Sequence, residues 1–243
     1  MNPVHQAAKC STCVIGKFCL PLGLSKDEAE QIDVLVNQKF KIKKGEYLYR
    51  QGDPFVSIYS IRFGSMKTEL LLQDGRSQII GFHLPGEILG LDGIGNNHYQ
   101  SEAIALEDCE VCIIQFSEFE ILCQKIPSLQ RHLYQILSRE ITQDHRHLLT
   151  LGSLNAEEKL AYLFIYLSER LVKRGLSAID FNLAMGREEI GDYLGLTIET
   201  VSRILSKFSQ AGIIEIKNKH LQILNIKELY RLAGSELTQP VRQ

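Results

Sequence analysis

Residues 187–210, REEIGDYLGLTIETVSRILSKFSQ, have the pattern of a helix-turn-helix. We predict a first helix over 187–194, a turn at Gly195 and Leu196, and a second helix that begins after Thr197. A threonine at that point suits a helix cap, because its hydroxyl accepts a hydrogen bond from a free backbone N–H. A purely structural helix hairpin shares this apolar pattern, so the pattern alone leaves that role open.

One face of the second helix carries side chains suited to base recognition. Glu199, Ser202 and Arg203 have the spacing i, i+3, i+4, which places them on the same side of a helix. Arginine donates two hydrogen bonds to guanine, glutamate accepts one from cytosine, and serine pairs with several base edges. The opposite side of this helix is apolar, as a side that faces the core should be.

The helix-turn-helix is flanked by further regular pattern. Asn155 and Glu158 form a capping-box signal for a helix that precedes it. Two short apolar stretches follow it, at 213–216 and 221–224, and they predict a β-hairpin wing. We therefore predict a winged helix-turn-helix domain over residues 153–243, and the wing favours a DNA-binding role.

The N-terminal half of the chain has a different pattern. Between residues 40 and 116, glycines separate short stretches rich in Ile, Leu, Phe and Tyr, which is typical of a small double-sheet β-roll. A hairpin is predicted at Gly75, because glycine takes a positive φ without strain. Ser25 and Glu28 form a capping-box signal for a short first helix. These patterns predict an α+β protein with a β-roll over residues 25–126.

A long helix is predicted over residues 127–152, and it carries a stripe with three- and four-residue steps. The apolar residues of the stripe are Leu133, Leu137, Ile141, Leu148 and Leu151, and Asp144 lies in the same stripe between Ile141 and Leu148. Such a seam suits dimerisation, and packing against the roll explains it equally well. The acid at position 144 favours a weak, switchable dimer, because two carboxylates facing each other across a two-fold axis repel.

Three cysteines lie in the N-terminal segment, residues 1–24. Cys10, Cys13 and Cys19 have the spacing C-x2-C-x5-C, and no basic or long apolar leader precedes them. We therefore expect a cytoplasmic protein, in which clustered thiols are more often metal ligands or redox groups than disulfides. Spacing alone slightly favours a structural zinc site over an iron–sulfur cluster.

The motif EIGDYLGLTIETVSRIL, with the roll and the long helix before it, resembles the Crp/FNR family of bacterial regulators. The E-x-x-S-R form and the N-terminal cysteines resemble its FNR branch, the regulators of fumarate and nitrate reduction. The resemblance implies a cyclic-nucleotide-binding-like roll and a homodimer that binds double-stranded DNA at TTGAT-type palindromes. It also implies contact with RNA polymerase and control of anaerobic genes. Glu199, Ser202 and Arg203 match the base-reading positions of that family.

The same resemblance implies an oxygen-labile [4Fe-4S] cluster on four cysteines. Cys10, Cys13 and Cys19 match the family's first three ligands. Cys112 matches the fourth, because the sequence VCIIQF fits the V-C-x-I-x-F context that the family has there. The remaining thiols, Cys109 and Cys123, are expected to be packed rather than ligating.

Apolar side chains between the ligands, Val14, Ile15 and Phe18, are expected to shield the cluster from oxygen. Without a cluster, closing the long loop from the N-terminal cysteines to the roll is entropically costly. We therefore expect loss of the cluster to release residues 1 to about 22. Repulsion between Asp144 carboxylates would then hold the cluster-free monomers apart.

Several other classes of function are disfavoured. The net charge is only −2, which argues against a protein that coats nucleic acid by bulk electrostatics. A cyclic nucleotide needs a cation for its phosphate, and residues 77–124 contain no Lys or Arg. A haem sensor would need ligands such as His83 or His98, and lone histidines support it weakly. No stretch is long and apolar enough to span a membrane, and no motif indicates an enzyme.

Overall fold

A computed structural model describes residues 9–33, 35–36 and 38–234 of the chain. These residues form two compact units, which divide between Glu140 and Ile141. The longest helix, α3 (Pro127–Ser153), runs through this boundary and contributes residues to both units. The four domain ranges expected from the sequence remain a prediction.

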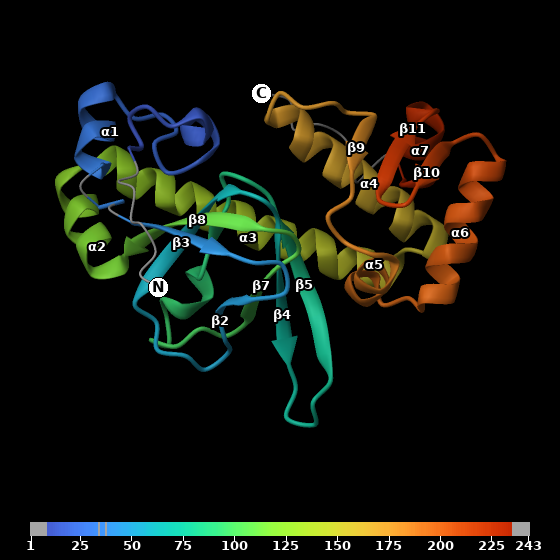
Figure 1. Ribbon diagram of the computed structural model, residues 1–243, viewed down its shortest axis with the longest axis horizontal. Helices are drawn as coiled ribbons and strands as arrows, with labels where there is room; N and C mark the ends of the chain where they lie inside the picture. The colour runs from blue at the N-terminus through green and yellow to red at the C-terminus, as the bar shows by residue number, and fades with distance from the viewer. Residues whose placement is uncertain (1–8, 34, 37, 235–243) are drawn as a thin grey trace. The chain divides into compact units, whose positions relative to one another are not determined.

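Two antiparallel sheets of four strands each form the β-roll of the first unit (Figure 1), as predicted. One sheet has the order β1 (Gln38–Ile42), β8 (Cys109–Gln115), β3 (Ser57–Phe63), β6 (Ile88–Leu89). The other has the order β2 (Tyr47–Tyr49), β7 (Glu102–Ala105), β4 (Met66–Leu71), β5 (Ser77–His83). The predicted hairpin joins β4 to β5, and Gly75 takes a φ of 87° in its turn.

The helical elements of the first unit are η1 (Val14–Phe18), α1 (Lys26–Ile32), η2 (Leu91–Gly93), α2 (Phe116–Lys125) and the first half of α3. Residues of α1, η2, α2 and α3 pack against one apolar face of the first sheet. The predicted capping box is present at the start of α1, where Ser25 and Glu28 exchange hydrogen bonds.

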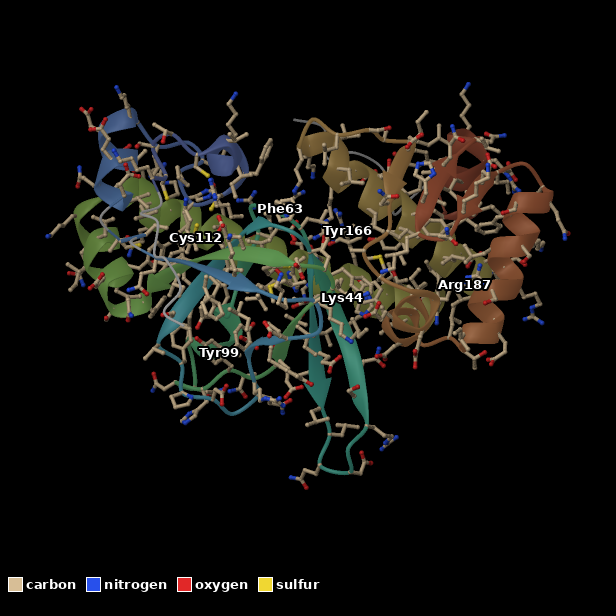
Figure 2. The ribbon with its side chains drawn as sticks, in the orientation of Figure 1. Lys44, Phe63, Tyr99, Cys112, Tyr166 and Arg187 are labelled. Carbon is tan, nitrogen blue, oxygen red and sulfur yellow. The ribbon has the colours of Figure 1, made fainter. Side chains whose placement is uncertain are left out.

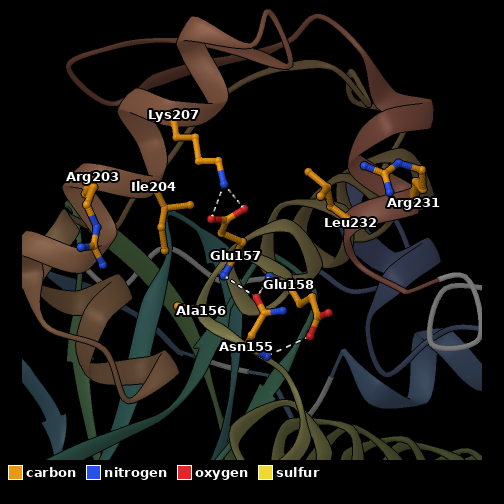
Figure 3. A pocket seen from close by; sticks show the side chains of 9 residues that line it. All are labelled: Asn155, Ala156, Glu157, Glu158, Arg203, Ile204, Lys207, Arg231 and Leu232. Atoms are coloured by element: carbon orange, nitrogen blue, oxygen red, sulfur yellow. Dashed lines mark hydrogen bonds and ion pairs between the residues drawn. The ribbon is translucent and has the colours of Figure 1, made fainter.

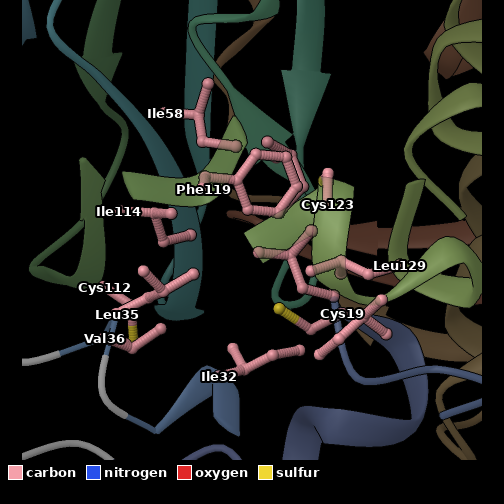
Figure 4. Close-up of a cluster of buried hydrophobic side chains, with 13 residues drawn as sticks. Cys19, Ile32, Leu35, Val36, Ile58, Cys112, Ile114, Phe119, Cys123 and Leu129 are labelled. Carbon is pink, nitrogen blue, oxygen red and sulfur yellow. The ribbon is translucent and has the colours of Figure 1, made fainter. Parts of the chain in front are cut away.

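Strand β8 places its side chains in two separate apolar clusters, because neighbouring residues of a strand point to opposite faces. Cys112 and Ile114 lie in a cluster with residues of the N-terminal segment, α1, α2 and α3, whereas Cys109 and Val111 lie inside the roll. Figure 4 shows the first cluster, with the sulfur atoms of Cys19 and Cys112 among aliphatic and aromatic side chains. We call this first set of residues the outer cluster.

The second unit is a winged helix-turn-helix. Its elements after α3 are α4 (Ala156–Lys173), β9 (Asp180–Asn182), α5 (Arg187–Leu194), α6 (Ile198–Gln210), β10 (Ile214–Lys217), β11 (His220–Ile223) and α7 (Ile226–Leu232). The predicted capping box of Asn155 and Glu158 begins α4. The wing has a third strand, β9, which pairs with β11 and which the sequence did not predict. Three residues are too few for an alternating pattern to be recognised.

Among the described residues, no helix combines the length and the apolar character that a membrane span needs.

Candidate functional site

Four cysteines from two distant parts of the chain line one small cavity in the first unit. Cys10, Cys13 and Cys19 reach it from the N-terminal segment, and Cys112 reaches it from β8. The cavity has a volume of about 20 Å³, which is room for about one water molecule. The structure therefore gathers the four cysteines that the sequence selected as ligands.

A series of tight turns brings the N-terminal thiols together. The backbone N–H of Cys13 donates to the carbonyl of Cys10 at 3.2 Å, and Gly16 N–H donates to Cys13 O at 3.0 Å. The short helix η1 then fills the space between Cys13 and Cys19. Ser11 ties the segment to the end of α1, because its N–H and hydroxyl donate to the two carboxylate oxygens of Asp33 at 2.9 and 2.5 Å.

Burial and mutual repulsion both act against free thiolates at Cys10, Cys19 and Cys112. Burial, followed by the neighbouring thiols, raises the pKa of Cys112 to about 12. The same causes raise the pKa of Cys10, and burial raises that of Cys19, whose Sγ lies 2.9 Å from the hydroxyl of Ser60. The fully ionised set is therefore stable only with a cationic centre between the thiols.

The donor set fits an iron–sulfur cluster, since such clusters are held by four cysteine thiolates. Among the described residues, no three His, Cys, Asp or Glu side chains are arranged to hold a single metal ion. The cavity is small, so the N-terminal segment has to move outward to admit a cluster.

The two remaining cysteines lie away from the cavity. Cys109 is three positions before Cys112 on β8 and therefore faces the inside of the roll, where its Sγ donates to the carbonyls of Ser65 and Glu107 at 3.3 and 3.2 Å. Cys123 is buried in the outer cluster on α2.

The three apolar residues expected to shield the thiols have different surroundings. Ile15 lines the cavity. Val14 does not shield it, because its side chain is 90% exposed and points to solvent from the first residue of η1. Phe18 packs instead against Gly86, where an added Cβ would lie only 2.8 Å from the Cβ of Phe18.

In the second unit, two glycines set the turn between α5 and α6. A Cβ at Gly191 would lie 2.6 Å from the carbonyl of Leu196, so only glycine permits this close approach. Gly195 takes a φ of 62° and ends α5. Thr197 then caps α6 as predicted, and its hydroxyl accepts from the N–H of Thr200 at 3.2 Å.

The base-reading candidates lie on the outer face of α6. Glu199 and Arg203 are exposed and Ser202 is half-buried, whereas the apolar residues Val201, Ile204 and Leu205 are buried, as predicted. Arg187 also joins this face, because its guanidinium donates to the hydroxyl of Ser202 at 3.3 Å. Sequence reasoning missed Arg187, which lies 15 residues away and meets Ser202 only through the turn.

Beside α6 lies a groove of about 640 Å³ between α4, α6 and α7 (Figure 3). Arg203, Lys207 and Arg231 bring positive charge to its walls. Lys207 is held by Glu157 at the start of α4, with Nζ–O distances of 2.6 and 2.8 Å. This ion pair joins the last turn of α6 to the first turn of α4.

The predicted seam residues of α3 have two different surroundings. Ile141 is 56% and Leu148 is 66% exposed, and Asp144 between them is exposed as well. Leu137 is half-buried. Leu133 packs against the outer cluster of the roll, and the neighbouring Tyr134 is 59% exposed. Packing within the first unit therefore explains the apolar character of Leu133, the first residue of the stripe. Ile141 and Leu148, in the C-terminal part of the stripe, remain exposed apolar surface.

Two family models match the chain: the cyclic nucleotide-binding domain over residues 39–126 and the Crp-like helix-turn-helix domain over residues 158–232. The transcriptional regulatory protein btr of Bordetella pertussis is 44% identical, covering 95% of each chain. The transcriptional activator protein anr of Pseudomonas aeruginosa is 43% identical, over 95% of this chain and 94% of that protein. The fumarate and nitrate reduction regulatory protein of Escherichia coli is 41% identical, over 94% and 91%.

Solved structures agree with these relatives. FixK2 from Bradyrhizobium japonicum has a TM-score of 0.75 and 32% identity, and the match covers 81% of this chain and 97% of that chain. A CooA mutant from Carboxydothermus hydrogenoformans shares the fold, with a TM-score of 0.66, 20% identity, and coverage of 81% and 88%. No catalytic family is indicated, and the relatives named above are regulators of transcription. The chain therefore belongs to the Crp/FNR family of DNA-binding transcription regulators.

Proposed function

We propose that the protein is an oxygen-responsive regulator of anaerobic gene expression, with a [4Fe-4S] cluster on Cys10, Cys13, Cys19 and Cys112. The observation that carries the proposal is the convergence of these four thiols, and no other cysteine, on one cavity. When bound, the cluster supplies an oxygen-labile centre with one thiolate ligand for each iron. Similarity to the fumarate and nitrate reduction regulatory protein supports the same assignment.

The outer cluster gives the thiol site a mechanical connection to α3. Cys19 and Cys112 are buried in it together with Leu129, and Leu133 and Ile136 of α3 pack against it. Because packed cores transmit displacement, a movement of the N-terminal segment when the cluster enters or leaves the site changes the support of the first turns of α3. Loss of the cluster thereby reaches the helix that we assign to dimerisation.

The exposed part of α3 is the proposed dimer seam. Ile141 and Leu148 supply apolar surface, and Asp144 places one carboxylate from each protomer close to the two-fold axis. Repulsion between the two carboxylates makes the dimer weak, and the cluster-bound form overcomes it by ordering α3. The monomer–dimer balance therefore follows the state of the thiol site.

The dimer presents two α6 helices to a palindrome with TTGAT-type half-sites. Arg203 contacts guanine, Glu199 accepts from cytosine, and Ser202 contacts a further base edge, oriented by its bond to Arg187. Thr197 starts α6 and holds its N-terminal residues in position for the major groove. Contact with RNA polymerase at the promoter and a cytoplasmic location complete the proposal.

The side chains inside the roll support a sensor that binds no cyclic nucleotide there. The rings of Tyr49 and Tyr99 stack there with centroids 4.0 Å apart, and Tyr59 lies beside them. Glu102 at this end of the roll is paired with Arg50 at 3.9 Å, and Asp92 accepts a hydrogen bond from the hydroxyl of Ser101 at 2.6 Å. The carboxylate of Asp92 would repel a phosphate. Figure 2 shows Tyr99 in this part of the roll, away from Cys112.

The haem alternative has little support from the histidines considered for it. Nε2 of His83 lies 2.9 Å from the hydroxyl of Thr68 inside the roll, and Nδ1 of His98 lies 3.1 Å from the carbonyl of Asn96. Each ring therefore already has a hydrogen-bonding partner.

The test is a visible absorption spectrum with iron and sulfide analysis, on protein prepared without oxygen and again after exposure to air. About four iron and four sulfide per monomer, with absorbance that bleaches in air, is the expected result. A colourless protein with one zinc would overturn the oxygen-sensing role and leave the DNA reader intact.

A further inference from the structure

The part of α3 within the second unit has two faces with different tasks. Ile141 and Leu148 lie on its exposed face, with Asp144 between them. The opposite face is buried to different degrees: Thr150 is 1% exposed, and His147 is half-buried. The proposed dimer seam and this inner face are therefore two sides of the same stretch of helix, residues 141–153.

His147 on the inner face stacks on the first helix of the helix-turn-helix. Its ring centroid lies 4.1 Å from that of Tyr193 on α5, with an angle of 15° between the ring planes. Nε2 of His147 is buried and has no hydrogen-bond partner among the described residues. Burial, with Lys159 nearby, lowers the pKa of His147 to about 4, so the ring is neutral at physiological pH and acts by packing.

Two further contacts hold the same end of α5. The Nζ of Lys159 donates to the carbonyl of Leu194 at 3.2 Å, which satisfies one of the free carbonyls at the end of the helix. Leu151 on α3 lies beside Gly195, the first residue of the turn, since a Cβ added there would lie 3.7 Å from a methyl group of Leu151. The end of α5 and the turn before α6 are thus fixed on α3 and the start of α4.

We propose that His147 is a positioning residue that couples the dimer seam to the DNA-reading helix through its stack on Tyr193. This inference rests on the proposed dimer seam and deepens the proposed function. Because the seam residues and His147 share one rigid helix, the way two α3 helices pack in a dimer determines where each α5–turn–α6 segment lies. A palindrome needs both α6 helices at the correct spacing, so a loose stack weakens DNA binding without weakening the dimer.

The experiment compares three variants of the full-length protein with the wild type. His147→Ala removes the stack, and His147→Phe keeps an aromatic ring and removes the unsatisfied nitrogen. His145→Ala is the matched control, because His145 is an exposed histidine on the same helix. Dimerisation is measured by sedimentation, DNA binding by fluorescence anisotropy on a TTGAT palindrome without oxygen, and the order of α5 by hydrogen exchange without DNA.

For His147→Ala we expect faster hydrogen exchange across α5 and about two- to twelvefold weaker binding to the palindrome, the value of one aromatic stack. Its dimer dissociation constant should stay that of the wild type. His147→Phe should restore both properties, and His145→Ala should not alter the exchange of α5.

Unchanged exchange and unchanged DNA affinity in His147→Ala would overturn the inference, and so would a loss of DNA binding that tracks a weaker dimer. Failure of the wild type itself to bind the duplex would contradict the proposed function instead. Hydrogen exchange of α5 still tests the role of His147 in that case, because this measurement needs no DNA.

Discussion

The thiol site and the DNA-reading helix are assembled over very different lengths of chain. The DNA-reading helix-turn-helix lies within residues 187–210, and its two helices, its turn and its cap are neighbours in sequence. The thiol site joins Cys19 to Cys112, which are 93 positions apart (112 − 19), and it needs the whole roll to bring them together. Closing such a long loop costs conformational entropy, which the packing of the outer cluster offsets.

This difference suits the two tasks. A DNA reader has to keep one shape, and local hydrogen bonds and caps define that shape with little help from the rest of the protein. A sensor has to change its structure in response to a signal. A site made from two distant segments can do so, because the segments separate when the cluster that joins them is lost. On the proposed function, the wide separation of the thiols gives loss of the cluster a large structural effect.

Removal of the distant ligand should have the largest effect. We expect Cys112→Ser to prevent cluster assembly, and specific DNA binding should then fall about 10³-fold or more, to the level of non-specific binding. Iron analysis and anisotropy on the palindrome measure the two effects. Cys109→Ser is the matched control on the same strand, and its thiol faces the inside of the roll. Equal losses in the two variants would show that the strand, and not the cavity thiol, is responsible.

Substitution of Asp144, the acid in the proposed dimer seam, should have the next largest effect. Asp144→Ala removes the repulsion across the two-fold axis, and we expect the air-exposed protein to dimerise at least about tenfold more strongly. Sedimentation in air measures this change. A variant that remains as monomeric as the wild type would contradict the role of Asp144.

The same carboxyl predicts a pH dependence. Although Asp144 is exposed, partial desolvation by its neighbours raises its pKa above the usual value. Repulsion is therefore present above that pKa and is lost as the pH falls through it. The air-exposed wild type should therefore dimerise more strongly on mild acidification, and Asp144→Ala should show no such dependence.

On the reader, Arg203→Ala should lower specific binding by roughly 10- to 100-fold and relax the preference at one base pair of each half-site. Anisotropy on duplexes with single substitutions measures both effects. Lys227→Ala is the control, since it removes an exposed positive charge from α7 in the same unit. A uniform loss on all duplexes would assign Arg203 to the phosphate backbone instead of a base.

The smallest effect is expected from the apolar lining of the thiol cavity. Ile15→Ala should make the cluster decay severalfold faster in air, because the side chain lines the cavity and limits access to it. Val14→Ala should not change the decay, since this side chain is exposed. Absorbance decay measures both rates, and equal rates would show that oxygen enters by another path.

The sequence alone determined the local parts of this protein. The capping boxes at Ser25 and Asn155, the Gly75 turn and the Thr197 cap were all predictable, because each is a hydrogen bond or a backbone angle within a few residues. The resemblance to the FNR branch added the four cysteines, which lie in recognisable local motifs.

Only the tertiary structure decided which of these residues meet. It placed Ile15 at the thiol cavity and Val14 in solvent, although the two are adjacent in η1. It directed Leu133 into the outer cluster, and it brought Arg187 to Ser202 and His147 to Tyr193. The physical reason is that residue types and spacing determine local hydrogen bonds, whereas burial depends on which distant surfaces pack together.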